Sequence, residues 1–150
     1  MVVLARRGER RRLEEGRRLG KSNAKRVLYN LDAVVASLRR AANGTHDVKV
    51  VSLDASVPWS LQVALWRRAK AVVGLHGGEL AGAVFLGPGQ ALVEITPPEH
   101  SCGHPSMFAH AAIAAGAAYR GVLCQQCSMA RGGFVSAGLV ARAVAGVLVM

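Results

Sequence analysis

Apolar runs and amphipathic segments alternate along the whole chain, and this order constrains the fold more than any other feature of the sequence. The run KAVVGL at 70–75 is almost continuously apolar, which is typical of a strand buried on both faces of a parallel sheet. The segment 30–44 has apolar residues on one helical face, with Asn30 as a predicted N-cap and Asn43-Gly44 as a predicted end. Strands alternating with helices predict an α/β fold with a Rossmann-like parallel sheet flanked by helices.

The same alternation extends over the rest of the sequence. Further strands are predicted at 1–7, 47–53, 90–98 and 117–124, and we expect 117–124 to be the final strand. Further helices are predicted at 58–69, from about Glu79, at 105–116 and at 135–149. Ligands of such sheets bind at the carboxyl ends of the strands. The loop that follows 70–75 is therefore the first candidate for a functional site.

The positive charge is concentrated near the start of the sequence. The 150 residues carry a formal net charge of +10, and ten of the 19 basic residues lie between Arg6 and Arg26. A nucleic-acid-binding face more often interleaves basic and aromatic side chains, but the first aromatic residue is Tyr29. We therefore interpret 9–25 as a basic, flexible, solvated insertion within a single domain spanning 1–150, with nucleic acid or acidic lipid as the alternative partner.

The sequence has none of the patterns typical of a secretory signal, a membrane span or a disulfide framework. The sequence begins without a secretory signal pattern, and no apolar tract is long enough to span a membrane. Three cysteines do not predict a disulfide framework. Cys124 and Cys127 have the spacing of half a zinc site, but no second pair completes it, and the pair does not open a helix as a thioredoxin-like motif would. We expect neither a metal nor a cofactor.

The segment GLHGGEL, which begins in the last two residues of the buried run and continues into the following loop, has the residue types of an anion site. A helix start exposes unpaired N–H groups, and glycines let a phosphate approach the backbone. His76 can donate a hydrogen bond to a phosphate, whereas the charge of Glu79 would repel one. A structural turn explains the same residues equally well. The glycines that would give access to the backbone are Gly74, Gly77, Gly78 and Gly82.

A longer stretch, SVPWSLQVALWRRAKAVVGLHGGELAGAVFLGPGQALVEITP, resembles the C-terminal part of the family 61 glycosyltransferases. The family pattern places a Gln in a helix before a hydrophobic-x-Gly-x-His-Gly segment, which is followed by Leu, Phe, Pro-Gly, Glu and Pro. The resemblance runs from about residue 2 to about residue 123. The matching positions are Gln62, Ala69, Gly74, His76, Gly77, Leu80, Phe85, Pro88, Gly89, Glu94 and Pro97, with Arg26 and Asn30 upstream and Gly116 and Tyr119 downstream.

The resemblance implies the C-terminal, donor-binding lobe of a two-lobed GT-B glycosyltransferase. Such an enzyme transfers a sugar from a nucleotide-diphosphate sugar, here expected to be a UDP-sugar, to a hydroxyl of a glycan or glycoprotein, with inversion at the anomeric carbon. The first lobe, with the acceptor cleft and the general base, is not in this sequence, so the chain is expected to be a truncated or inactive fragment. Full-length relatives would enter the lumen of the Golgi or endoplasmic reticulum. No metal is required, and we expect no nucleic acid partner.

The resemblance also implies roles for individual residues. Arg7 and Arg26 would neutralise the diphosphate oxygens as the leaving group departs. His76 would orient the diphosphate or face the sugar, and Glu94 would hydrogen-bond ribose hydroxyls. We therefore expect His76 and Arg7 in catalysis, and donor binding by Arg26, Gly74, Gly77, Gly78 and Glu94.

The sequence departs from the family pattern near the proposed phosphate. Gly78 stands where the family has Ala, and Glu79 stands where small or polar residues are usual. These departures keep a second hypothesis open, that of a nonenzymatic basic domain that binds nucleic acid or an acidic polymer. The affinity of such a domain for its polyanionic partner would fall steeply with salt concentration, and this binding would be lost when residues 9–25 are deleted.

Overall fold

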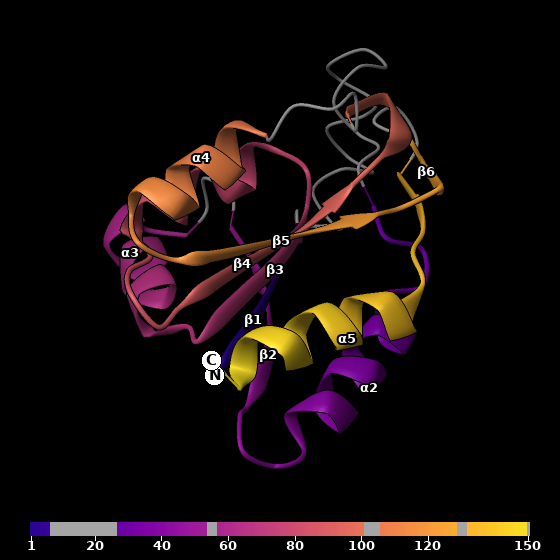
Figure 1. The fold of residues 1–150 in the computed structure, drawn as a ribbon, viewed down its shortest axis with the longest axis horizontal. Coiled ribbons are helices and arrows are strands. Elements are labelled where there is room, and N and C mark those ends of the chain that lie inside the picture. The colour runs from indigo at the N-terminus through magenta and orange to yellow at the C-terminus, as the bar shows by residue number, and fades with distance from the viewer. Residues whose placement is uncertain (7–26, 54–56, 101–105, 129–131, 150) are drawn as a thin grey trace.

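The computed structural model describes residues 1–6, 27–53, 57–100, 106–128 and 132–149, and its centre is a five-stranded sheet (Figure 1). All neighbouring strands are parallel, in the order β2-β1-β3-β4-β5, which confirms the predicted α/β fold. The strands are β1 (Val2–Arg6), β2 (Val48–Ser52), β3 (Ala71–Leu75), β4 (Ala91–Thr96) and β5 (Ala118–Leu123).

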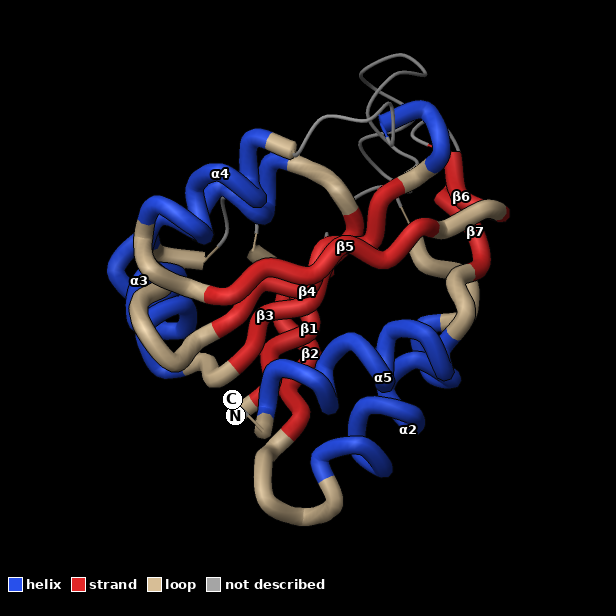
Figure 2. The backbone as a smooth tube through the Cα atoms, viewed as in Figure 1, coloured by secondary structure: helices blue, strands red, loops and turns tan. Residues whose placement is uncertain are grey.

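Helices cover both faces of the sheet, as Figure 2 shows. On one face, α2 and α5 pack against each other over a core that includes Val73 and Val93. On the other face, the core of α3, α4 and the 3-10 helix η1 includes Val72 and Leu92. Alternate residues of β3 and β4 thus enter opposite cores, as the period of two requires, and both strands are buried along most of their length. The bounds are α2 (Leu31–Ala42), α3 (Trp59–Arg68), η1 (Gly78–Phe85), α4 (Met107–Ala114) and α5 (Ala137–Leu148).

The short helix predicted from about Glu79 is confirmed as the 3-10 helix η1, which begins at Gly78. The expectation about the last strand needs correction. β5 is not the last strand, because β6 (Gln126–Ser128) and β7 (Gly132–Phe134) form an antiparallel hairpin after it. Each of these strands has only three residues, too few for a periodic signal.

Asn30 precedes α2, as predicted, but its side chain does not cap the helix. Its Nδ2 donates to the Val135 carbonyl oxygen at 2.7 Å, and its Oδ1 accepts from the Val135 N–H at 3.2 Å. The side chain therefore joins the start of α2 to the segment between β7 and α5. The predicted end of α2 is confirmed, because Asn43 adopts the left-handed conformation, with φ 43°.

The strand order places a topological switch point between β1 and β3. The chain moves from β1 outward to β2, returns to β3 on the other side of β1, and continues outward through β4 and β5. Crevices of open α/β sheets form where the connections diverge, at the carboxyl ends of those two strands. His76 is the first residue after β3 and therefore lies at this edge.

Candidate functional site

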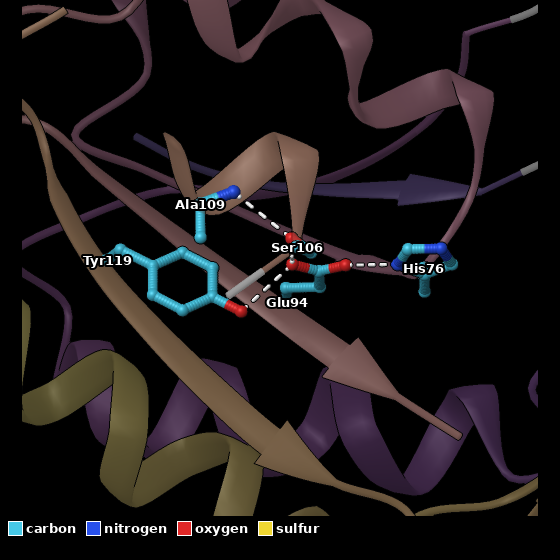
Figure 3. A network of polar contacts seen from close by, with 5 residues as sticks. All are labelled: His76, Glu94, Ser106, Ala109 and Tyr119. Carbon is cyan, nitrogen blue, oxygen red and sulfur yellow. Dashed lines mark hydrogen bonds and ion pairs between the residues drawn. The ribbon is translucent and has the colours of Figure 1, made fainter. Parts of the chain in front are cut away.

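A fully buried carboxylate, that of Glu94 in β4, is the centre of a polar network at this edge (Figure 3). Oε1 faces Nδ1 of His76. Oε2 accepts from the Ser106 hydroxyl and, at 2.9 Å, from the Tyr119 hydroxyl. Three donors from three other parts of the chain therefore satisfy a group whose burial alone would be costly.

The His76 ring is held on several sides. Because a carboxylate only accepts hydrogen bonds, Nδ1 carries the proton, and the tautomer is fixed with Nε2 as the second functional atom. The ring stacks on His100 with centroids 4.5 Å apart and contacts Phe108 edge-on at 5.3 Å. The backbone N–H of His76 donates to the Ile95 carbonyl at 2.8 Å. His76 is thus an oriented imidazole, with 14% of its side chain exposed.

The strand register explains how Glu94 reaches all three donors. Gly74 of β3 and Gly121 of β5 are the ladder neighbours of Glu94, and paired residues in parallel strands point to the same face. Neither neighbour has a side chain to fill the space beside the carboxylate. A Cβ at Gly121 would lie 3.4 Å from the Tyr119 hydroxyl oxygen. The two glycines therefore leave room for the network.

The remaining donors are positioned by α4 and β5. Ser106 is the N-cap of α4, where its Oγ accepts from the Ala109 N–H at 3.0 Å while it donates to Glu94. Burial, followed by the charge of Glu94 and the hydrogen bond to it, raises the pKa of Tyr119 to about 12. Tyr119 therefore stays a donor throughout the physiological pH range.

The glycines after His76 differ from one another. A Cβ at Gly77 would lie 2.8 Å from a carboxylate oxygen of Glu79, so this side chain folds back over the turn. A Cβ at Gly78 would meet nothing within 4 Å. The space beside Gly77 that the sequence suggested for a phosphate thus holds the end of a flexible acidic side chain, which must turn away before an anion can bind there.

Several predicted site residues have other positions than expected. Gly74 lies inside β3, as the predicted strand requires, and is paired in the sheet on both sides, so it does not offer its backbone to an anion in the loop. Gly82 packs against the indole of Trp66, because a Cβ there would lie 2.0 Å from the ring nitrogen. Glu94 is not placed to bind ribose, since it has no exposed surface and both its oxygens accept from protein groups. Arg7 and Arg26 lie outside the described residues.

Ser106, Tyr119 and His100 were not predicted as members of the site. Tyr119 was noted only for the family resemblance, and Ser106 only within a helical segment. The available signal was the buried strand 90–98, in which a lone Glu requires donors from neighbouring elements. The sequence does not identify those donors, because they depend on the strand register and on where α4 begins.

Cys124 and Cys127 form a disulfide, with Cα atoms 5.3 Å apart and both residues buried. As a disulfide, the pair offers no thiolates as metal ligands. Among the described residues, no group of three or more His, Cys, Asp or Glu side chains could hold a metal ion. Within the same residues, no helix has the length and apolar character needed to cross a membrane.

Comparison of the fold with solved structures gives several matches that extend over nearly the whole chain, and two of them illustrate the likeness. The flavodoxin-like domain of a Synechococcus sp. protein has a TM-score of 0.52 at 11% identity, covering 99% of this chain and 94% of that one. The diflavin flavoprotein A3 of Nostoc sp. has a TM-score of 0.53 at 13% identity, covering 99% and 88%. At these identities the likeness shows the fold alone.

The fold and the His76 network define an α/β domain with a polar site at the switch point of a parallel sheet. The family model of Glycosyltransferase 61 matches residues 2–93, more than half of the sequence. The chain therefore belongs to the glycosyltransferase 61 family, which confirms the resemblance. The matched range includes His76 and ends one residue before Glu94. A search of the curated proteins finds no match to this chain.

Proposed function

We propose that this chain is the donor-binding lobe of a glycosyltransferase that uses a nucleotide-diphosphate sugar, specifically a UDP-sugar. The observation that carries the proposal is His76, which Glu94 holds in a fixed tautomer at the switch point of the sheet. Family membership supports glycosyl transfer as the class of reaction. The sugar, the acceptor and the stereochemistry are part of the proposal.

In the proposed reaction, an acceptor hydroxyl oxygen attacks the anomeric carbon and the bond from that carbon to the diphosphate oxygen breaks. The nucleoside diphosphate leaves with the electron pair, and the hydroxyl proton passes to a base that we expect in the first lobe. Attack from the face opposite the leaving group inverts the anomeric carbon. The acceptor is the hydroxyl of a glycan or glycoprotein.

His76 would act on the leaving group. Nε2, when protonated, donates a hydrogen bond to a diphosphate oxygen, and the Nδ1–H bond to Glu94 keeps the ring in that orientation. The backbone at Gly77 and Gly78 would contribute N–H groups once the Glu79 carboxylate turns away. Arg7 and Arg26 are proposed as the cations that neutralise the diphosphate.

A lumenal location in the Golgi or endoplasmic reticulum is also proposed. The buried Cys124–Cys127 disulfide supports it, because disulfides persist in oxidising compartments and are rare in the cytosol. No observation on the described residues favours the nucleic-acid alternative, whose basic segment 9–25 lies outside them.

Calorimetric titration of the wild-type chain with UDP and with inorganic pyrophosphate tests the proposed donor site. We expect both to bind, and His76→Ala to weaken each about 10- to 100-fold, the range for a lost charge-assisted hydrogen bond. Arg26→Ala should weaken both in the same direction. The matched control is His110→Ala, an exposed histidine of α4, with wild-type affinity expected. Saturating UDP that changes neither the melting temperature nor amide exchange at 74–82 would contradict the proposal.

A further inference from the structure

Two exposed aromatic rings, Tyr29 and Phe134, lie against each other near the same edge of the sheet. Their centroids are 5.4 Å apart in an edge-to-face arrangement, and 56% and 53% of the two residues are exposed. They come from segments far apart in the sequence, one before α2 and the other in β7. Water-exposed aromatic surface in a paired arrangement calls for an explanation beyond the packing of the core.

The backbone beneath the two rings is rigidly joined. The Tyr29 N–H donates to the Gly133 carbonyl, and the Gly133 N–H donates to the Val27 carbonyl, both at 2.9 Å. The Asn30 side chain binds both polar groups of the Val135 backbone. Hydrogen bonds therefore fix the chain on both sides of each ring.

Two further features hold the hairpin in place. A Cβ at Gly132 would lie 2.1 Å from the Val27 carbonyl oxygen, and one at Gly133 would lie 2.1 Å from that of Gln126. Only glycine permits three backbone segments to approach this closely. The Cys124–Cys127 disulfide anchors the middle residue of β6, the cross-strand partner of Gly133, to the residue that follows β5. The two rings are thus preorganised, which lowers the entropic cost of binding a ligand.

A polar side chain lies beside the rings. Gln126 is the cross-strand partner of Phe134 in the β6–β7 hairpin, so their side chains point to the same face. The Gln126 residue is exposed, and its amide carries both donors and acceptors. Aromatic surface with an adjacent amide suits a planar heterocycle that stacks and also hydrogen-bonds along its edge.

The hairpin is connected to the His76 site through one short element. His100, whose ring stacks on His76, ends the helical turn η2 (Pro98–His100), and η2 packs against β6. Figure 2 shows the hairpin and this turn next to each other beyond the end of β4. A ligand with a diphosphate at one end and a planar ring at the other therefore has matching groups at both places.

We propose that Tyr29 and Phe134, with Gln126, form a subsite that stacks the nucleobase of the donor nucleotide. This inference rests on the proposed function, because it assigns the second end of the ligand whose diphosphate contacts His76. Stacking on aromatic rings recognises the planar base, and the Gln126 amide recognises its polar edge.

The test compares binding of UDP and of inorganic pyrophosphate, which has no base, by calorimetric titration. Tyr29→Ala and Phe134→Ala should each lower the affinity for UDP roughly ten-fold, because each removes one base–aromatic stacking contact, and should leave the affinity for pyrophosphate unchanged. Tyr29→Phe keeps the ring and should bind UDP as the wild type does. Trp59→Ala is the matched control, because Trp59 is also exposed and edge-to-face with Phe85 but lies in α3, on the opposite face of the sheet.

The outcomes separate this inference from the proposed function. Binding of pyrophosphate together with unchanged UDP affinity in both alanine variants would overturn the nucleobase subsite and leave the diphosphate site intact. An equal loss of affinity for UDP and for pyrophosphate would also overturn it, because the substitutions would then act through the stability of the fold and not through the base. Loss of affinity for an oligosaccharide acceptor alone would assign the rings to carbohydrate instead. Failure of the wild type to bind either ligand would reject the proposed function and this subsite with it.

Discussion

The two glycine pairs, Gly77-Gly78 and Gly132-Gly133, have opposite structural requirements. At the first pair, an added Cβ meets either the flexible end of Glu79 or open space. At the second pair, an added Cβ meets backbone carbonyl oxygens at 2.1 Å. The first pair therefore keeps space accessible, whereas the second allows the chain to pack against itself.

This difference shows that two Gly-Gly pairs with the same composition can have different structural roles, so the role cannot be predicted from the residues alone. The pair after His76 follows a buried strand and invites a functional interpretation, while the pair in β7 carries no chemistry of its own. Each pair nevertheless adjoins a group that we propose contacts the ligand, His76 in one case and the Tyr29–Phe134 pair in the other. His76 is oriented by side chains, and the Tyr29–Phe134 pair is oriented by backbone. The two regions should respond differently to substitution.

The largest effect is expected for Gly133→Ala. Its Cβ would overlap the Gln126 carbonyl, which cannot move without breaking the hairpin, so we expect the free energy of unfolding to fall by about 3 kcal/mol. Gly78→Ala is the matched control and should change stability by less than about 0.5 kcal/mol, since its Cβ meets open space. Urea unfolding of both variants provides the measurement. Equal stabilities would remove the distinction between the two pairs.

An intermediate effect is expected for Glu94→Gln. The amide keeps the shape of the side chain but directs an N–H₂ group at either His76 or the two hydroxyls, so at least one donor faces a donor. We expect a loss of about 2 kcal/mol in unfolding free energy and a change in the His76 tautomer. Urea unfolding and nitrogen NMR of the imidazole report the two changes. Asp47→Asn, at an exposed carboxylate just before β2, is the control and should change neither, and a Glu94→Gln variant with wild-type stability and tautomer would refute the central role of Glu94.

The smallest effect is expected for Tyr119→Phe, which removes one of the three donors to Glu94. At pH 7 the loss should be about 1.5 kcal/mol. The pKa of Tyr119 is raised from 10.0 to about 12 in the folded chain, so the unfolded chain loses this proton first as pH rises. The stabilisation is complete below pH 10 and declines between pH 10 and pH 12. Urea unfolding at several pH values should show the advantage of the wild type over the variant shrinking across that interval. An advantage that stays constant up to pH 12 would show that the phenol is not coupled to folding.

The main architecture was predictable because it depends on long apolar runs. The run at 70–75 forms β3 (Ala71–Leu75), in which every residue is buried, and Asn43 ends α2 as predicted. The hairpin was not predictable, because three-residue strands with two glycines have no periodic pattern. The disulfide was also missed, since its spacing is equally that of half a zinc site.

The site was predictable only in part. His76 follows a buried strand and belongs to a recognised motif, so it could be placed at the edge of the sheet. The role of Glu94 depends on groups 12, 18 and 25 residues away in the sequence, brought together by register and by the start of α4. Gly74 lies within the strand predicted at 70–75, but its place beside Glu94 depends on the register of β3 and β4, which the sequence does not give. The sequence contains each of these residues but not their distances.

The Asn30 side chain also has a consequence for how the chain folds. Its two partners, the polar groups of Val135, lie 105 residues later in the sequence. Contacts of such long sequence separation carry a large loop-closure cost and form late. During synthesis the Tyr29–Phe134 pair therefore cannot be fixed in place until Val135 has left the ribosome, so we expect the proposed nucleobase subsite to assemble late in folding.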